Sequence, residues 1–232
     1  TCHDIHNSGE NNLAFAVTPD GRHTQHAVPT VFNVSLLSSY FWIGSAQTLE
    51  QQAVGPLGEM TFGDLDVVSQ NLNRIEGYRQ QFKAVFRIPT IQLRDVVHAI
   101  ASFERTLNTF DSPYDVNSLT LKAKRGQRFF REIGCAGCHD GPAFGGRSFT
   151  EFPIFRESAY VSKYKLQDDL GRFQVTQNQQ DKNVWRVAPL RNIALTAPYF
   201  HNGSVANLGE AVRVMALTQL NRKLSQLEVR SL

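Results

Sequence analysis

The sequence predicts a mainly α-helical protein that consists of two domains and contains long loops. Three observations support this fold class. Apolar residues recur at helical spacing in several segments, whereas strand-like alternation is scarce. A Cys-His-Asp sequence occurs twice, at residues 2–4 and 138–140. Residues 140–198 contain closely spaced Gly and Pro with few periodic runs, which is typical of an extended loop region.

The second Cys-His-Asp sequence belongs to a complete C-x-x-C-H motif formed by Cys135, Cys138 and His139. Two thiols at this spacing can form thioether bonds to the vinyl groups of a haem, and the adjacent imidazole can bind the iron. A zinc site would need a second pair of ligands, and a thioredoxin-like redox site would need a βαβ context. Since residues 119–134 instead indicate a helix that ends at Gly134, the motif favours covalent haem attachment.

The first Cys-His-Asp sequence has the same ending but lacks the leading cysteine, which would lie two residues before Thr1. We expect Cys2 and His3 to be the remainder of a second attachment motif, with further residues upstream. A count of three cysteines also argues against a disulfide framework. The prediction is therefore two cytochrome c-like domains whose loops wrap two covalently bound haem c groups. Beyond the twin motifs no internal repeat is apparent.

Amphipathic patterns predict the main helices. In the N-terminal half they cover residues 64–82 and 90–107, the second capped by Thr90. In the C-terminal half, helices are expected over 119–134, 207–220 and 224–232. The last of these stops after about two turns, which predicts that the protein continues past the given sequence.

The segment between the two sets of helices predicts a domain boundary. Residues 108–118 contain Pro113 and several small polar residues, which is typical of a linker. We place the boundary at residue 115, which gives an N-terminal domain, 1–115, and a C-terminal domain, 116–232.

Composition excludes several classes of protein. Hydrophobic residues make up 41% of the chain and aromatic residues 10%, which is enough to build folded cores. The net charge of +3 is too small to indicate a nucleic-acid partner, and no apolar run is long enough to predict a membrane span. Because bacterial haem c is assembled outside the cytoplasm, the attachment motifs predict a periplasmic protein.

Two longer segments identify a family. The sequence RVAPLRNIALTAPYFHNGSVANLGEAVRVM, residues 186–215, resembles the signature of bacterial dihaem cytochrome c peroxidases, and PTVFNVSLLSSYFW, residues 29–42, resembles their N-terminal domain. With both attachment motifs, the resemblance covers nearly the whole chain. It implies reduction of hydrogen peroxide to water, with electrons from a small cytochrome c or cupredoxin. It also implies that the protein is a candidate homodimer.

In this family the C-terminal haem relays electrons and is bound by His and Met. The resemblance implies that Met215 joins His139 on this iron, because the family's Met falls fourteen residues after the His of the YFH motif, here His201. From spacing alone, Met215 is more typical of a core position on an amphipathic helix than of an iron ligand. The related maturation enzyme MauG carries Tyr at this position. Arg186 and Arg191 flank a Pro-Leu turn and are candidate partners of haem propionates, with His201 as a further pocket residue.

The N-terminal haem of the family reacts with peroxide, and the resemblance makes His3 its proximal ligand. The family uses a Glu from a GP-x-x-EM type loop to move protons during O–O cleavage, and GPLGEM places this residue at Glu59. Gln52 matches a second polar residue of the pocket, and Trp42 matches a tryptophan between the haems that assists electron transfer. Without the resemblance, these three residues are an exposed loop carboxylate, a helix-surface amide and a core aromatic residue.

One departure from the family concerns the distal side of the N-terminal haem. Many members have a distal His there in the resting state, but ungapped counting places Pro19 at that position. His23 and His26 are nearby candidates, and two solvated loop histidines are the alternative. We hypothesise that the sixth position of this iron is open or occupied by water, so that no reductive activation is needed.

The family also binds calcium between its domains. The backbone carbonyls involved match Thr196 and Pro198, but the Asn side chain that completes the site is replaced by Ala27. We therefore expect calcium to bind more weakly than in relatives. Two functions remain as alternatives: a dihaem electron carrier or redox sensor without peroxide chemistry, and a MauG-like oxidase of a protein or organic substrate.

Overall fold

The structure is a computed structural model that describes residues 2–232, and it confirms a mainly α-helical protein. The N-terminal half contains η1 Val34–Leu36, α1 Leu49–Met60, α2 Asp66–Arg74, α3 Glu76–Phe86 and α4 Leu93–Glu104. The C-terminal half contains α5 Leu121–Glu132, η2 Cys135–Gly137, β1 Phe149–Glu151, α6 Ala159–Lys163, α7 Phe173–Thr176, η3 Gln179–Asp181, β2 Val184–Arg186, η4 Ile193–Leu195, α8 Leu208–Leu220 and α9 Gln226–Ser231.

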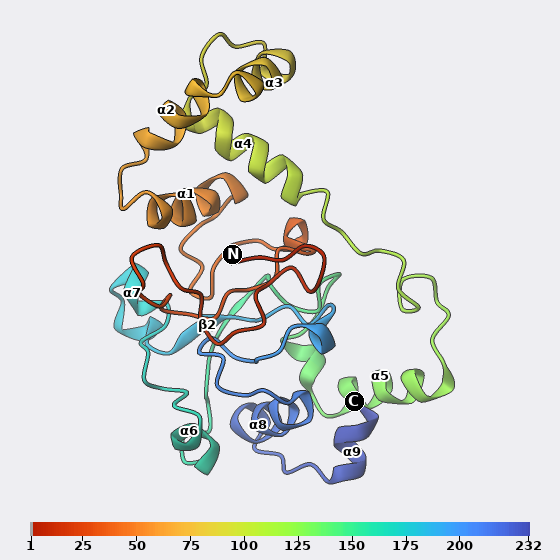
Figure 1. Cartoon of the computed structure of the whole chain (residues 1–232). Helices are drawn as coiled ribbons and strands as arrows, with labels where there is room; N and C mark the ends of the chain where they lie inside the picture. The colour runs from red at the N-terminus through yellow and green to blue at the C-terminus, as the bar shows by residue number, and fades with distance from the viewer. Residues whose placement is uncertain (1) are drawn as a thin grey trace.

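The helices lie at the two ends of the molecule, and loops from both halves meet between them. Figure 1 shows α1 to α4 at one end and α5, α8 and α9 at the other. In the middle, the backbone N–H of Arg186 donates to the carbonyl of Trp42 (2.9 Å), and that of Ala27 donates to the carbonyl of His201 (2.7 Å). None of the helices in residues 2–232 has the length and apolar character that crossing a membrane requires.

Helix α1 differs from the sequence prediction. The GPLGEM segment, expected to be a loop, continues the helix that begins after the Thr48 cap, and Pro56 lies inside it. Proline removes one helical hydrogen bond and normally disfavours an interior position. Here α1 packs along α4, burying Leu49 and Ala53 against the core that contains Ala101, and this packing outweighs the local preference. Glu59 therefore lies in the last turn of a helix and not in a loop.

The segment predicted as one helix over 64–82 is two helices. Ile75 has an extended ψ of 111°, and its N–H donates to the carbonyl of Leu72, which ends α2 before α3 begins. The predicted Thr90 cap is also wrong. Gln92 precedes α4, and its N–H donates to the carboxylate of Asp95 at 2.9 Å, which lies in the first turn.

The helices predicted in the C-terminal half are present in the structure and begin at capping residues. The hydroxyl of Thr120 accepts from the N–H of Ala123 at the start of α5, and the side chain of Asn207 accepts from the N–H of Glu210 at the start of α8. Helix α9 begins after Ser225, within the predicted segment. Between α5 and α8 the chain is largely irregular, as predicted. The short strands β1 and β2 pair antiparallel there, with Phe149 opposite Arg186.

The two halves share a structural repeat that the sequence analysis did not predict. Asn33 (φ 62°, ψ 17°) and Asn192 (φ 64°, ψ 16°) adopt the same left-handed conformation before η1 and η4. An antiparallel bridge follows in each half, Tyr40 with Ala46 and Tyr199 with Val205, and then α1 and α8 begin. By this correspondence Trp42 in the first half is equivalent to His201 in the second.

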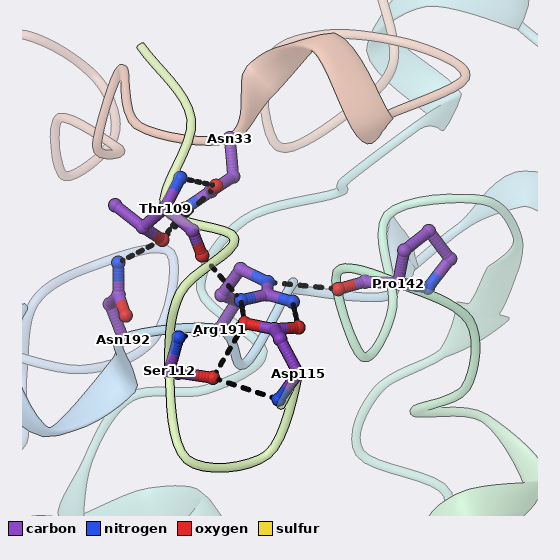
Figure 2. A network of polar contacts seen from close by, with 7 residues as sticks. All are labelled: Asn33, Thr109, Ser112, Asp115, Pro142, Arg191 and Asn192. Atoms are coloured by element: carbon purple, nitrogen blue, oxygen red, sulfur yellow. Dashed lines mark hydrogen bonds and ion pairs between the residues drawn. The ribbon is translucent and has the colours of Figure 1, made fainter. Parts of the chain in front are cut away.

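The predicted linker is fixed to the C-terminal half by Arg191 (Figure 2). The guanidinium of Arg191 donates to the carbonyls of Thr109 (2.7 Å) and Pro142 (3.0 Å) and forms a two-point ion pair with Asp115 at 2.9 and 2.5 Å. Asn33 contacts Thr109 from the N-terminal half. The domain boundary at residue 115 stays a prediction, but the segment around it is anchored on both sides.

Candidate functional site

The C-x-x-C-H motif begins with η2 and positions the imidazole of His139. The N–H of His139 donates to the carbonyl of Cys135 at 3.0 Å. Its Nδ1 lies 3.1 Å from the carbonyl oxygen of Ala188 and 3.3 Å from that of Phe144. Because a carbonyl only accepts, Nδ1 carries the proton, and Nε2 keeps its lone pair for a metal. Burial lowers the pKa of His139, which favours this neutral, ligating form.

The first motif repeats this arrangement. Nδ1 of His3 donates to the carbonyl of Gly9 at 3.0 Å, and burial lowers the pKa of His3. The thiols of Cys2, Cys135 and Cys138 are free, and the first and third are exposed. Both imidazoles and the adjacent thiols therefore have the chemistry that ligation of haem c requires.

The equivalent helices α1 and α8 carry the candidate distal residues. Met215 is the eighth residue of α8 and is half-buried against the core that contains Trp185. The eighth residue of α1 is Pro56. Gln52 and Glu59 lie four residues before and three residues after Pro56, so that all three share one face of the helix.

Glu59 is the acidic member of this face, and its side chain is 56% exposed. Its Oε2 lies 4.0 Å from Nη2 of Arg22, which also pairs with Asp20. The sequence prediction missed Arg22 because the two segments are distant along the chain and no local pattern joins them. The contact places the 18–22 turn beside the last turn of α1.

Trp42 lies where the two halves meet. Its indole Nε1 donates to the carbonyl of Ala27 at 2.8 Å, and its ring lies edge-on to His201 with centroids 6.4 Å apart. His201 is buried and stacks on Trp185, with centroids 3.9 Å apart and planes at 19°. Burial lowers the pKa of His201 to about 4, so that its imidazole is neutral near pH 7.

The two candidate loop histidines differ in their exposure to solvent. His23 is exposed, as the solvated alternative predicts, with its ring edge-on to Phe15. For His26 that alternative is wrong. Its side chain is 14% exposed, and its Nε2 lies 3.3 Å from Oδ2 of Asp169 in the C-terminal half. The imidazole of His26 is thus directed toward a carboxylate of the C-terminal half, and its role as a distal ligand stays a prediction.

The two arginines expected at haem propionates also differ. Arg186 is buried, and its Nε donates to the carbonyl of Phe41 at 3.0 Å. Its Nη1 is buried and lacks an acceptor among the described residues, and burial lowers the pKa of Arg186 to about 10. An unpartnered buried donor of this kind fits a propionate carboxylate. Arg191 does not fit this role, because its guanidinium is occupied by Asp115 and two carbonyls.

The segment proposed for calcium follows η4. Thr196 and Pro198 alternate with Leu195 and Ala197, whose carbonyl oxygens lie 3.4 and 3.3 Å from Nδ2 of Asn12. The same amide nitrogen lies 3.0 Å from Oε1 of the buried Glu10. Burial raises the pKa of Glu10 to about 7. The calcium site itself stays a prediction.

Known proteins show strong similarity to this chain. The model of the di-haem cytochrome c peroxidase family matches residues 1–122. A cytochrome c551 peroxidase of Nitrosomonas europaea is 35% identical over 238 residues, covering 99% of this chain and 70% of that protein. The cytochrome c551 peroxidase of Pseudomonas aeruginosa is 34% identical and covers 100% and 69%.

Solved structures show the same fold. A MauG-like protein associated with microbial copper homeostasis superimposes with a TM-score of 0.80 at 24% identity, covering 97% of this chain and 71% of that one. This likeness confirms the expected fold class, and the identities to the two peroxidases confirm an oxidoreductase of the peroxidase type. The chain belongs to the dihaem cytochrome c peroxidase family.

Proposed function

We propose that this protein reduces hydrogen peroxide to water at a haem bound through His3, with electrons that enter at a haem bound through His139 and Met215. The observation that carries the proposal is the difference between two equivalent helices. Helix α8 presents a thioether at its eighth position, whereas α1 has Pro56 there, which has no group that can bind iron. Met215 would close an iron held by His139 and suit it to electron relay, whereas an iron held by His3 would stay accessible to peroxide.

Haem c supplies the redox-active iron of both centres. Cys2, Cys135 and Cys138 provide thiols for its covalent attachment. The carbonyls of Gly9 and Ala188 orient the two proximal imidazoles and keep the proton on Nδ1. The free Nη1 of Arg186 donates to a propionate, and its N–H and Nε bonds to Trp42 and Phe41 hold that contact at the junction of the halves.

Glu59 moves the proton that O–O cleavage requires. Its carboxylate accepts a proton from the peroxide oxygen nearer to the iron and returns it to the farther oxygen, which leaves as water. Two electrons and two further protons complete the reduction of one peroxide to two waters. Gln52, on the same face of α1, donates a hydrogen bond that orients the peroxide. A positioned general acid and base of this kind contributes about 10²–10⁴-fold in rate.

The distal side of a haem held by His3 would be open in the resting protein. Pro19 has no ligating group, His23 is exposed, and His26 faces Asp169. The enzyme then needs no reductive activation before it reacts with peroxide. A resting spectrum in which both irons are six-coordinate and low-spin, one of them with two imidazoles, would contradict this.

Further parts of the proposal concern the surroundings of the enzyme. It works in the periplasm and takes electrons from a small cytochrome c or cupredoxin. The carbonyls of Thr196 and Pro198 hold a weakly bound calcium ion, and two copies of the chain form a homodimer. Trp42 assists the passage of electrons between the two haems.

The deciding experiment replaces the proton-transferring residue. Glu59→Gln is expected to lower peroxide turnover about 10²–10⁴-fold while the spectra of both haems stay unchanged. Glu76→Gln, at another exposed helix carboxylate, is the matched control and keeps full turnover. If Glu59→Gln turns over peroxide at the normal rate, the electron-carrier or sensor function is favoured.

A MauG-like oxidation of a protein or organic substrate is the second candidate. That activity requires peroxide to oxidise both irons. A thioether from Met215 disfavours this, because Met ligation raises the potential and stabilises the reduced iron.

A further inference from the structure

Trp185 lies between two imidazoles. One face stacks on His201, with ring centroids 3.9 Å apart and planes at 19°. The ring of His26 stands edge-on to it, with centroids 5.4 Å apart and planes at 85°. Trp185 itself is 3% exposed. No sequence motif singled out this residue, because its neighbours come from three distant segments.

The surroundings of Trp185 favour a positive charge on its ring. Asp169 lies behind His26, with Oδ2 3.3 Å from Nε2. Burial raises the pKa of Asp169, but hydrogen bonds from His26 and from the N–H of Gly171 outweigh this effect and bring the pKa to about 2. This carboxylate is therefore ionised at neutral pH. The imidazole of His201 is neutral. A partly buried, ionised carboxylate behind His26 stabilises the loss of an electron from the nearby ring of Trp185.

The indole N–H of Trp185 has no acceptor among the described residues to which it could give its proton. Its Nε1 is buried and lacks a hydrogen-bond acceptor among the described residues. An oxidised tryptophan whose N–H has no acceptor keeps its proton and persists as a radical cation. The electron can then be restored without a proton returning at the same moment.

A short series of rings joins Trp185 to Trp42. His201 stacks on Trp185 and lies edge-on to Trp42, with centroids 6.4 Å apart. The structural repeat explains this meeting, because Trp42 and His201 occupy equivalent positions and face each other where the halves join. A single imidazole therefore separates the two tryptophans.

We propose that Trp185 is a second redox-active tryptophan, which stores an oxidising equivalent when peroxide reacts in the absence of donor electrons. This rests on the proposed function, in which Trp42 exchanges electrons with the haems. Peroxide is the oxidant: breaking its O–O bond to give two waters takes two protons from solvent and two electrons, of which one would come from the bound haem and the other from Trp42. Trp185 then gives one electron to oxidised Trp42 through His201 and becomes a radical cation that retains its N–H proton. An electron from the donor protein later restores Trp185.

The experiment treats the dihaem protein with one equivalent of peroxide without donor and records electron paramagnetic resonance after rapid freezing. A tryptophan radical is expected, and under excess peroxide peptide mass mapping should find hydroxylated or ring-opened tryptophan at residue 185. Trp185→Phe should lower the radical yield at least about threefold and move the oxidation to Trp42. Tyr160→Phe, in the same core but outside the ring series, should leave both readouts unchanged.

A further variant tests the electrostatic part. Asp169→Asn should shorten the lifetime of the radical severalfold while leaving Trp185 in place.

The measurements distinguish an error in the role of Trp185 from an error in the proposed function. Normal peroxide turnover with donor, but no oxidation mark at Trp185 and an unaltered radical in Trp185→Phe, would overturn the role of Trp185 alone. The oxidation map of the unmodified protein decides the matter even if a variant does not fold. A protein that consumes no peroxide overturns both.

Discussion

Pro56 and Met215 occupy the same position, the eighth residue, of the equivalent helices α1 and α8. Each helix follows a Tyr-centred bridge and a left-handed asparagine, so that the correspondence extends over the whole approach to the helix. At this position α8 carries a thioether that can bind iron, whereas α1 carries a proline that cannot. This relationship leads to the first two predictions.

Placing a thioether on α1 should close the reactive site. Pro56→Met is expected to convert the His3 haem to a six-coordinate, low-spin form and to lower peroxide turnover by about 10-fold or more, because peroxide must compete with an internal ligand. Optical spectra and steady-state peroxide consumption measure both effects. The control is Pro56→Ala, which introduces no ligand and should keep the spectrum and most of the turnover. An unchanged spectrum in Pro56→Met would show that this position does not face the iron.

Removing the thioether from α8 should alter the relay centre. Met215→His is expected to lower the reduction potential of the second haem by about 100 mV or more, because Met ligation favours reduced iron. Spectroelectrochemical titration measures the shift. Met60→Leu, at the exposed methionine of the chain, is the matched control and should leave both potentials unaltered. Equal potentials in Met215→His and the parent protein would remove Met215 from the ligand set.

The ion pair and hydrogen bonds of Arg191 with the segment 109–115 should stabilise the folded protein over a wide pH range. Hydrogen bonds from Arg191 and Ser112 hold the pKa of Asp115 well below its usual range, so that its carboxylate is more readily ionised in the folded than in the unfolded chain. The stabilisation is therefore present above about pH 4 and is lost on further acidification. Arg191→Gln should lower Tm by about 5 °C at pH 7. Calorimetry should find little change for Arg147→Gln, an exposed arginine.

Glu104 should make the protein less stable as the pH rises from about 4.5 to 7. The residue is 9% exposed, its Oε2 lacks a partner among the described residues, and burial raises its pKa to about 7. The folded state binds the extra proton between about pH 4.5 and 7, so that stability is lost as pH rises through this range. The loss amounts to about 3 kcal/mol in free energy of unfolding.

The test of Glu104 compares denaturation at several pH values. Glu104→Gln should flatten the decline between pH 4.5 and 8 and give a higher Tm than the parent protein at pH 8. Glu132→Gln, at an exposed carboxylate, should reproduce the parent curve. A decline of the same steepness in Glu104→Gln would assign it to another group.

Two equivalent glycines should be essential for the contact between the halves. Gly44 (φ +65°) and Gly203 (φ +57°) follow Trp42 and His201, and each approaches the opposite half. A Cβ at Gly44 would lie 2.3 Å from Cζ of Phe149, and one at Gly203 would lie 2.5 Å from Cα of Ala14.

Alanine at either glycine should lower the free energy of unfolding by more than the strain of a left-handed backbone alone. Gly21 (φ +81°) has nothing within 4 Å of the added Cβ, so that Gly21→Ala should cost about 1 kcal/mol from the left-handed backbone only. Gly44→Ala and Gly203→Ala should each cost at least about 2 kcal/mol more, because a backbone or ring must move. Urea denaturation measures all three variants. Equal losses in the three would mean that the halves accommodate the methyl groups freely.

The amino-acid sequence alone determined the features that depend on neighbouring residues. The Cys135–His139 motif specifies haem chemistry within five residues, and helices α5 and α8 begin at caps that bond to their own first turns. The loop-rich stretch before α8 followed from closely spaced Gly and Pro. Such interactions extend over only a few positions, so that the pattern is visible in the sequence.

Only the tertiary structure decided features that depend on contacts between distant segments. Packing against α4 keeps α1 helical through Pro56, Asp169 withdraws His26 from solvent, and Asp115 occupies Arg191. The repeat that pairs Trp42 with His201 was also missed and became apparent from the shared backbone conformation, although Tyr40 and Tyr199, and Gly44 and Gly203, are identical residues at equivalent positions. The competing local preference of Pro56 is worth about 3 kcal/mol, and burial against α4 outweighs it. Burial and ion pairing across the fold likewise fix the environments of His26 and Arg191.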